Sequence, residues 1–337
     1  MLPRTNRQVR LKSRPSGLPQ AENFELAEAP VPELREGEFL VRNHYLSVDP
    51  AMRGWVSAVA NYSAPVGIGE VMRAFAAGEV IASRHTGYAA GDKVMGLLGW
   101  QEYAVTDGAA VTRKVKETDL PLSLSLGILG LNGVTAYFGL LEVGQPRPGE
   151  TVLVSTAAGA VGSAVGQIAK IAGCRTIGIA GGPVKARLCR ELFGYDAAID
   201  YKAGGSLDDA IAAACPGGID VYFDNTAGAI SDAVLRHLAT GARVVICGTA
   251  SVASWDPPPL GPRVERHLLV KRARMQGFLV FDFRHRHEEA VARLAQWVRE
   301  DRLSYREDIL EGIEHCPGAI AGLYRGENLG KRLIRLG

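Results

Sequence analysis

A glycine-rich segment in the middle of the chain has the residue types and spacing for the most specific chemistry. From residue 152 to 167 it reads VLVSTAAGAVGSAVGQ, so an apolar strand turns through small residues directly into a helix. Backbone amides at a helix N-terminus point towards an anion, and only small residues let the backbone approach a pyrophosphate closely. Against the usual GxGxxG pattern, Ala157 stands at the first position, with Gly159 and Gly162 at the later ones. The segment predicts a dinucleotide-binding loop, with glycines needed only for helix–strand packing as the alternative.

The residues after the second predicted strand indicate which dinucleotide binds. A site for NAD normally has an acid there, roughly 20 residues after the glycine loop, to bind the ribose hydroxyl pair. Here the strand at 175–180 is followed by Gly-Gly-Pro, and no acid occurs before Glu191. Lys185 stands near the start of the next helix, where its charge can neutralise a 2′-phosphate. We therefore expect NADP(H), although Lys185 taken singly fits a solvated helix residue equally well.

The chain offers few ligands for a catalytic metal. A catalytic zinc needs about three protein ligands from Cys, His and acidic residues. The first 125 residues contain only His44 and His85 and no cysteine, while His285 and His287 stand at the start of a predicted helix without partner ligands. We expect no metal site. The five cysteines form no CxxC pair and are expected to be reduced thiols: Cys174, Cys189, Cys215, Cys247 and Cys316.

Two patterns of secondary structure divide the chain. Up to about Leu120, short branched and aromatic runs punctuated by Gly and Pro predict a β-rich domain. Strands are expected there at 8–12, 39–48, 79–83, 93–97 and 102–105, followed by a helix at 135–142.

After Pro148 the pattern changes to alternating strands and helices. Six strands in a βαβ series predict a doubly wound parallel sheet with right-handed crossovers. The strands are expected at 151–155, 175–180, 197–200, 219–224, 242–247 and 275–280, and helices at 160–172, 185–193 and 284–300. We expect a β-rich substrate domain at 1–125, a nucleotide-binding domain at 126–300, and a return to the first domain at 301–337.

Composition favours a globular protein with a small-molecule partner. The 337 residues are 47% hydrophobic and 22% charged, with a formal net charge of +2 that gives no global bias towards nucleic acid. The most apolar stretch, 152–172, is interrupted by three glycines and carries Gln167 and Lys170, so no membrane span is expected. No apolar signal-peptide segment follows the arginine-rich N-terminus, so we expect a cytoplasmic location.

Seven segments in order resemble the zinc-free medium-chain dehydrogenases/reductases that include leukotriene B4 12-hydroxydehydrogenase, prostaglandin reductase, plant alkenal double-bond reductases and bacterial curcumin reductase. They are NHYLSVDPAMR (43–53), GWQEYAV (99–105), GVTAYFGL (133–140), residues 157–170, DVYFDN (220–225), MQGFLVFDF (275–283) and GENLGK (326–331). The resemblance covers nearly the whole chain. It implies an α/β fold with a Rossmann sheet plus a β-rich GroES-like domain, NADPH as cofactor, and a homodimer.

The same resemblance implies a set of cofactor-binding residues. Pyrophosphate binding falls to Gly159, Ala160, Val161 and Gly162, and the adenosine 2′-phosphate region to Lys185 and Tyr201. The rest of the cleft is assigned to Asn225, Cys247, Gly248, Thr249, Ala250, Ser251, Phe278, Leu279, Val280 and Asn328. The alternatives are that Tyr201 only caps a loop and that Asn225 only forms a turn.

Without a metal Lewis acid, conjugate reduction is the chemistry that we expect. The β-carbon of an enone or enal is already electrophilic and accepts a hydride from the nicotinamide, while hydrogen-bond donors stabilise the charge that develops on the carbonyl oxygen. Many relatives carry a tyrosine after the fifth strand, where this chain has Ala253. Tyr62 is the replacement candidate for the donor. Its alternative role is an apolar wall of the pocket.

Two other functions remain open at this point. An NADPH:quinone reductase would use the same cofactor loop and also lack zinc. A protein that binds NADPH without catalysis is suggested only by Ala253.

Overall fold

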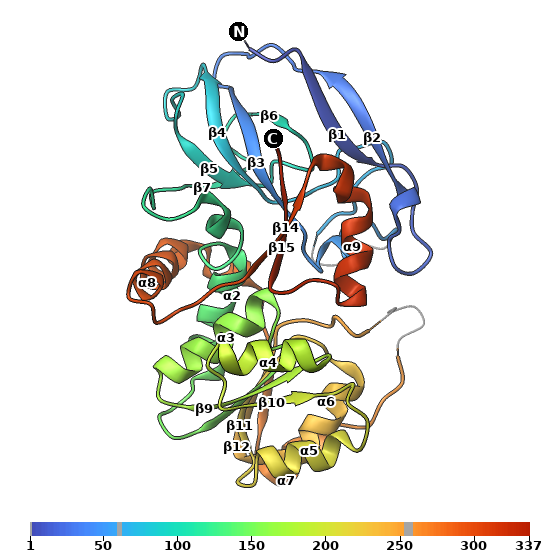
Figure 1. Cartoon of the computed structure of the whole chain (residues 1–337), viewed down its shortest axis with the longest axis vertical. Coiled ribbons are helices and arrows are strands. Elements are labelled where there is room, and N and C mark those ends of the chain that lie inside the picture. Colours follow the sequence, from blue (N-terminus) through green and yellow to red (C-terminus); the bar gives the residue numbers. More distant parts are fainter. Residues whose placement is uncertain (1, 59–62, 253–258) are drawn as a thin grey trace. The chain divides into compact units, whose positions relative to one another are not determined.

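The computed structural model describes residues 2–58, 63–252 and 259–337 of the chain. By contacts between residues, the chain divides into two units: Met1–Gly127 with Glu307–Gly337, here called the β-rich unit, and Ile128–Arg306, here called the α/β unit. Both are drawn in Figure 1, coloured along the sequence. No helix in the described part of the chain is long and apolar enough to cross a membrane.

The β-rich unit is built around strand β3 (Phe39–Ser47), which pairs with β4, β6 and β15. Its sheet has the order β14-β15-β3-β4-β5-β7, with β6 also on β3, and β1 and β2 pair separately. The strands are β1 (Thr5–Leu11), β2 (Phe24–Pro30), β4 (Ala76–Ser83), β5 (Lys93–Gly96), β6 (Tyr103–Thr106), β7 (Val111–Lys114), β14 (Glu307–Glu311) and β15 (Lys331–Arg335). The helices are η1 (Ala21–Asn23), α1 (Met52–Trp55), η2 (Leu122–Leu126), η6 (Ile313–His315) and α9 (Cys316–Arg325).

The α/β unit contains a parallel sheet with the order β10-β9-β8-β11-β12-β13 in the described part of the chain. Its strands are β8 (Thr151–Ser155), β9 (Arg175–Ala180), β10 (Ala197–Asp200), β11 (Ile219–Asp224), β12 (Leu238–Ile246) and β13 (Arg274–Gly277). Its helices are α2 (Leu131–Phe138), η3 (Gly139–Gly144), α3 (Ala160–Ile171), α4 (Pro183–Glu191), α5 (Leu207–Ala214), α6 (Gly228–Val234), η4 (Leu235–His237), α7 (Glu265–Lys271), η5 (Val280–Arg286) and α8 (His287–Arg299).

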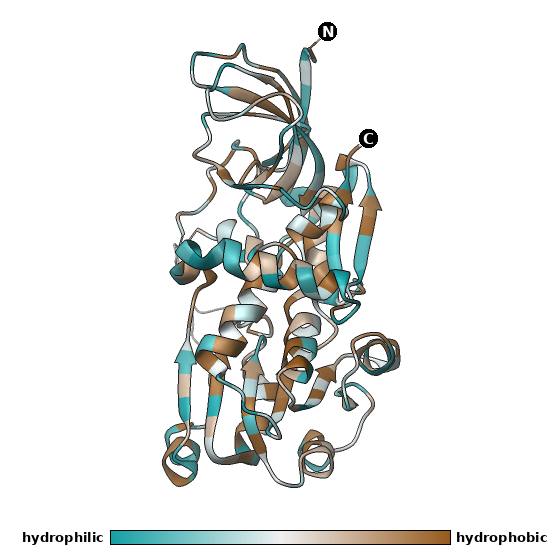
Figure 2. Ribbon diagram, turned by 90° about the vertical axis from the view of Figure 1, so that its left-hand side faces the viewer, coloured by the Kyte–Doolittle hydropathy of each residue, from teal (hydrophilic) through white to brown (hydrophobic). Residues whose placement is uncertain are grey.

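Both faces of the central part of this sheet are covered, as expected for the strands β8, β9 and β11, which are buried along most of their length. Leu153, Ile177 and Ile179 share a core cluster with residues of α5 and α6 on one face. Gly178 points to the opposite face, where it lies against Tyr195 and the residues near α3. In Figure 2 the strands carry long apolar stretches, whereas the helices around them mix apolar and polar residues. The structure confirms the predicted doubly wound sheet and the β-rich domain.

Several predicted elements are wrong in their bounds, among them the strand expected at 242–247, which begins four residues earlier, at Leu238. The strand expected at 275–280 ends at Gly277, because the ring of Phe278 turns from the sheet to pack on Gly139. The helix expected from residue 284 begins at His287, after a 3-10 segment. The helix expected at 135–142 begins earlier, at Leu131, and its last turns are π-helical.

The order of the strands creates one switch point in the sheet. From β8 the chain runs outward through β9 to β10, then returns to β11 on the other side of β8 and continues to β13. In doubly wound sheets, ligands bind outside the carboxyl ends of the strands at such a point. The carboxyl ends of β8 and β11 therefore mark the place to look for a site.

Candidate cofactor site

The turn between β8 and α3 has the shape that a phosphate-binding loop requires. Gly159 is the N-cap of α3, and the turn begins at Thr156 with a positive φ of 53°. A Cβ on Gly162 would lie 2.2 Å from the carbonyl oxygen of Thr156 and 2.9 Å from Cα of Ala157. Only glycine therefore lets α3 pack this closely on the turn, so that the N–H groups of Ala160 and Val161 stand at the free end of the helix.

A buried tyrosine, Tyr195, packs between α3 and the sheet and supports this turn. The hydroxyl of Tyr195 donates a hydrogen bond of 2.6 Å to the carbonyl of Gly162, and its ring occupies space that a Cβ on Gly166 or Gly178 would fill. Burial raises the pKa of Tyr195 well above its ordinary value, so the phenol stays a donor at neutral pH. Three glycines and one aromatic ring thus fix the helix against the sheet.

Tyr201 and Lys185 follow the carboxyl ends of the neighbouring strands β10 and β9. Tyr201 is 44% exposed, and its ring lies directly against Gly181, since a Cβ there would be 2.9 Å from the Tyr201 hydroxyl. Lys185 is the third residue of α4, in the first turn after β9. The structure therefore brings both predicted residues to the edge of the sheet where the adenosine ribose of a dinucleotide binds.

An acid does stand at this edge, but its hydrogen bonds are directed to the backbone. Asp200 ends β10 and accepts hydrogen bonds from the N–H of Gly182, at 2.7 Å, and of Lys202, at 2.9 Å, on the same oxygen. These bonds fix the loop that leads into α4. After β9, the chain continues with Gly181 and Gly182 rather than an acid, so no side chain at the end of this strand fills the space or repels a 2′-phosphate.

Asn225 joins the two halves of the sheet at the switch point. Its backbone N–H donates to the hydroxyl of Ser155 at 2.8 Å, and its side-chain amide donates to the carbonyl of Ser155 at 2.7 Å. These bonds continue the pairing of β11 with β8 beyond its last residues. The side chain therefore has a structural role in addition to the predicted contact with cofactor, which remains a prediction.

The predicted loop after β12 folds onto the end of β11. The N–H groups of Cys247 and Gly248 donate to the carbonyl of Asp224, and that of Ala250 donates to the carbonyl of Asn225. Val252 closes a turn with Thr249. Ser251 donates through its hydroxyl to the carbonyls of Thr226 and Ala227, at 2.7 and 2.9 Å. All five predicted residues, 247–251, thus lie beside Asn225.

Cys247 is held as a neutral thiol at this position. Burial raises its pKa to about 12, and the nearby charge of Asp224 acts in the same direction. A thiol is neither a nucleophile nor a metal ligand until it loses its proton. Cys247 is therefore suited to contact a ligand rather than to react with it.

The other predicted residues are placed less uniformly. Phe278 packs on Gly139 and lies edge-on to Phe223, 6.5 Å between ring centroids, so its ring makes contacts within the α/β unit. Leu279 is 39% exposed, and Val280 begins η5. Their contacts with cofactor remain predictions.

Three residues of the prediction require separate treatment. Asn328 belongs to the β-rich unit, is 8% exposed and donates to the carbonyl of Gly330 at 2.7 Å, which closes the turn before β15. Tyr62 and Ala253 lie outside the described residues.

Sequence reasoning missed two residues that organise the site. Asp224 ends β11 and accepts hydrogen bonds from the N–H groups of Thr226 and Ala227 in the loop that follows, and Tyr195 supports the glycine turn. Asp224 could have been singled out because it is a charged residue at the end of a mostly apolar run. Glycines at 162, 166 and 178 on elements that must pack together were a signal that a bulky side chain fills the space between them.

In residues 2–58, 63–252 and 259–337, no group of three or more His, Cys, Asp and Glu side chains could hold a metal ion. None of the five cysteines forms a disulfide.

Comparison with known protein families identifies both units. Residues 7–114 match the family model described as the N-terminal domain of oxidoreductase, and residues 160–296 match the one described as zinc-binding dehydrogenase. The second match covers most of the α/β unit, including the turn at Gly159 and Gly162 and the strands from β9 to β13.

Comparison with individual proteins covers almost the whole chain. The NADPH-dependent curcumin reductase of Escherichia coli is 44% identical over 338 residues, 98% of this chain and 97% of that protein. The 2-alkenal reductase (NADP(+)-dependent) of Nicotiana tabacum is 36% identical over 98% of this chain and 97% of its own length. The crystal structure of CurA from Vibrio vulnificus in complex with NADPH is 42% identical, with a TM-score of 0.92 over 98% of this chain and 99% of that one.

The glycine turn, the basic edge without an acid on β9 and these full-length matches agree with one another. The chain therefore belongs to the medium-chain dehydrogenase/reductase family, among the NADP-dependent oxidoreductases that act on carbon–carbon double bonds.

Proposed function

We propose that the protein uses NADPH to reduce the conjugated C=C bond of small α,β-unsaturated ketones and aldehydes. The observation that carries the proposal is the glycine turn at the switch point beside a β9 end that lacks an acid. Two relatives are named as reductases of curcumin and of 2-alkenals, and these activities support enones and enals as the substrate class.

The residues of the chain bind and orient rather than react. Ala160, Val161 and Gly162 offer backbone N–H groups to a pyrophosphate, and Lys185 with Tyr201 offers a cation and a hydroxyl to a 2′-phosphate. NADPH supplies a hydride when it is bound. The β-carbon of the substrate accepts the hydride, and a hydrogen-bond donor near the carbonyl oxygen lowers the energy of the enolate that forms. A proton then adds at the α-carbon.

The proposal is tested by comparing substrate classes under metal-free conditions. Loss of NADPH absorbance is followed with an enone, an enal and a quinone in buffer that contains a metal chelator. We expect turnover of the first two that is unaffected by chelation. Faster turnover of the quinone would support the alternative quinone reductase, and stoichiometric NADPH binding without turnover of any substrate would support the non-catalytic alternative.

Lys185 is expected to select NADPH over NADH. Lys185→Ala removes a cation from the first turn of α4, and loss of one charge-assisted phosphate contact costs roughly 1 to 3 kcal/mol. The ratio of kcat/KM for NADPH to that for NADH should fall by the corresponding factor, with the NADH value nearly unchanged. Arg190→Ala in the last turn of α4 is the matched control. An unchanged ratio in Lys185→Ala would exclude the phosphate contact.

Tyr62 is the proposed donor to the enolate oxygen. Tyr62→Phe keeps the ring and removes the hydroxyl. If the donor acts mainly in the transition state, kcat and kcat/KM should fall together by about tenfold or more, roughly 1.4 kcal/mol. A wall contact would instead raise KM and leave kcat within about twofold of wild type. That second result would reject Tyr62 as donor and favour a cofactor hydroxyl or water.

A homodimer is the proposed assembly. The support is the outer edge of β13, which pairs with no other strand in the described part of the chain. The helix that precedes it in the chain, α7, carries Leu269, 78% exposed, and Val270, 57% exposed. An open strand edge is a ready surface for a second copy. Light scattering after size exclusion should give twice the chain mass of 35.9 kDa, and the mass of one chain would contradict the proposal.

A further inference from the structure

Asp224 is a buried carboxylate that the proposed chemistry does not use. It is the last residue of β11 and is 1% exposed. None of the ion pairs found in the described part of the chain involves it. A buried carboxylate without a cation is costly unless hydrogen bonds compensate it, so its surroundings need an explanation.

Hydrogen-bond donors from four places in the chain converge on this carboxylate. Oδ1 accepts from the hydroxyl of Tyr222 and from the N–H groups of Thr226 and Ala227, each at 2.9 Å. The hydroxyls of Thr226 and Ser155 lie 3.2 and 3.3 Å from the same oxygen. Oδ2 accepts from the hydroxyl of Ser231 at 2.5 Å. Every partner has an N–H or O–H group that can donate to a carboxylate oxygen.

These bonds hold a strained turn at the end of β11. Ala227 has φ 57° and ψ −162°, a conformation that a non-glycine residue adopts only when its surroundings enforce it. The hydrogen bond from its own N–H to Asp224 is one such constraint. The next residue, Gly228, also has a positive φ, and a Cβ there would lie 2.7 Å from the hydroxyl of Ser251. The conformation of this turn therefore also fixes the position of Ser251 in the loop after β12.

The same residue fixes the ends of three strands. Its side chain is near the Ser155 hydroxyl of β8, its backbone carbonyl accepts from Cys247 and Gly248 after β12, and its own strand is β11. In a dinucleotide fold the glycine turn and the second strand hold the adenosine half, and the strands beyond the switch point hold the other half. Asp224 ends β11, the first strand beyond the switch point, and so belongs to the half of the sheet that holds the nicotinamide in such folds.

We propose that Asp224 is a positioning residue that sets the loops 225–228 and 247–251 for the nicotinamide half of NADPH, without touching the adenosine half. The inference rests on the proposed NADPH-dependent function. Asp224→Asn would replace an acceptor oxygen by an NH₂ group that faces N–H and O–H donors. The strained turn at Ala227 would then relax, and the loop 247–251 would shift with it through the Ser251 hydroxyl, which donates to the carbonyls of Thr226 and Ala227.

A pair of ligands separates this role from general support of the fold. NADPH contains both halves of the dinucleotide, whereas 2′,5′-ADP contains only the adenosine half with its 2′-phosphate. In Asp224→Asn, we expect the Kd for NADPH to rise at least tenfold and the Kd for 2′,5′-ADP to stay within twofold of wild type, both measured by isothermal titration. Ser231→Ala removes one donor to Oδ2 and keeps the carboxylate. It should raise the NADPH Kd severalfold with the same selectivity, and it carries the test if Asp224→Asn does not fold.

The same strand provides the matched control. Asp220 lies at the opposite end of β11 and accepts from the N–H of Thr151 at 2.8 Å, so Asp220→Asn should leave both affinities unchanged. Lys185→Ala should raise the Kd of both NADPH and 2′,5′-ADP, because both ligands carry the 2′-phosphate. If Asp224→Asn and Ser231→Ala weaken both ligands equally, or neither, the positioning role is overturned. If the wild-type protein itself fails to bind NADPH, the proposed function is overturned instead.

Discussion

Gly162→Ala is expected to weaken NADPH binding about a hundredfold, roughly 2.7 kcal/mol. The new Cβ would lie 2.2 Å from the Thr156 carbonyl oxygen and 2.9 Å from Cα of Ala157. Both are backbone atoms of the phosphate-binding turn, so the turn must move away from α3 or the helix from the turn. Either movement misplaces N–H groups whose hydrogen bonds to a charged group contribute roughly 1.5 to 3 kcal/mol each. Isothermal titration with NADPH measures the loss.

Gly318→Ala is the matched control, because both glycines lie in helices. Gly318 is exposed in α9, and a Cβ there would meet no atom within 4 Å. Alanine is the better helix former, so this variant should be more stable by roughly 0.5 to 1 kcal/mol and bind NADPH normally. Wild-type affinity in Gly162→Ala would show that the close approach of turn and helix is not needed for binding.

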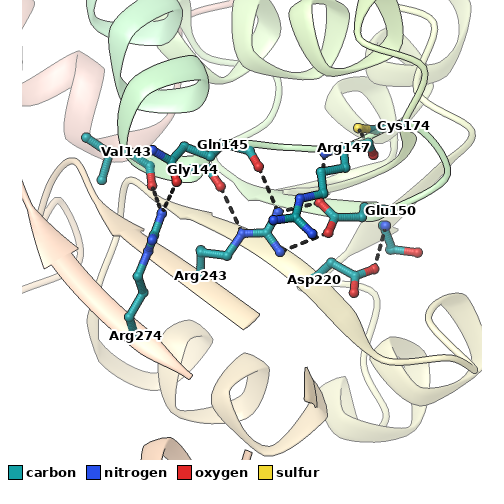
Figure 3. Close-up of polar contacts among 10 residues, drawn as sticks. Val143, Gly144, Gln145, Arg147, Glu150, Cys174, Asp220, Arg243 and Arg274 are labelled. Atoms are coloured by element: carbon teal, nitrogen blue, oxygen red, sulfur yellow. Dashed lines mark hydrogen bonds and ion pairs between the residues drawn. The ribbon is translucent and has the colours of Figure 1, made fainter. Parts of the chain in front are cut away.

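Arg243→Met is expected to lower the free energy of unfolding by about 3 kcal/mol. Arg243 on β12 donates to both oxygens of Glu150, and to the carbonyls of Gly144 and Gln145 at 3.0 Å each (Figure 3). The two charged side chains are only 14% and 18% exposed. Removal of the guanidinium leaves a half-buried carboxylate and two carbonyls without these donors. Chemical denaturation measures the effect.

The pH dependence of this loss identifies its cause. Burial alone would raise the pKa of Glu150, but hydrogen bonds from Arg243 and from the Arg147 N–H lower it below the ordinary 4.5. A lowered folded-state pKa adds stability above the unfolded-state value, and that stability disappears as the pH falls through the folded-state pKa. The difference between wild type and Arg243→Met should therefore be largest near pH 7 and shrink below pH 4.5.

A surface pair in the same unit provides the control for this variant. Arg236 pairs with Asp208, but their side chains are 43% and 39% exposed, and an exposed ion pair contributes under about 1 kcal/mol. Arg236→Met should therefore change stability little. Equal losses in both arginine variants would mean that the burial of Arg243 and Glu150 does not matter.

The sequence predicted the parallel sheet well because most of its strands are short and apolar and are followed by glycine or proline. Four of the six predicted strands, at 151–155, 175–180, 197–200 and 219–224, match their observed bounds. The strand at 275–280 was predicted too long, because Phe278 is apolar for a reason other than the sheet, namely its packing on Gly139. A run of apolar residues predicts burial, but it does not predict which element the side chains will pack against.

The parts of the candidate site that are formed by one continuous segment could be predicted from the local sequence pattern. The glycine turn and the β9 end without an acid could be identified because each is continuous in sequence. The hydrogen bonds to Asp224 could not be predicted, since its donors come from residues 155, 222, 226, 227 and 231, and only the folded sheet brings these together. The bonds of Asp200 to Gly182 and Lys202 required the observed loop for the same reason.

The fate of the transferred hydride tests the central claim most directly. NADPH that carries deuterium at the transferable C4 position is incubated with an enone, and the product is examined by nuclear magnetic resonance. Conjugate reduction predicts deuterium at the β-carbon and a solvent hydrogen at the α-carbon, with the carbonyl intact. Deuterium on the carbonyl carbon, with the C=C bond retained, would contradict the account and make the protein an ordinary carbonyl reductase.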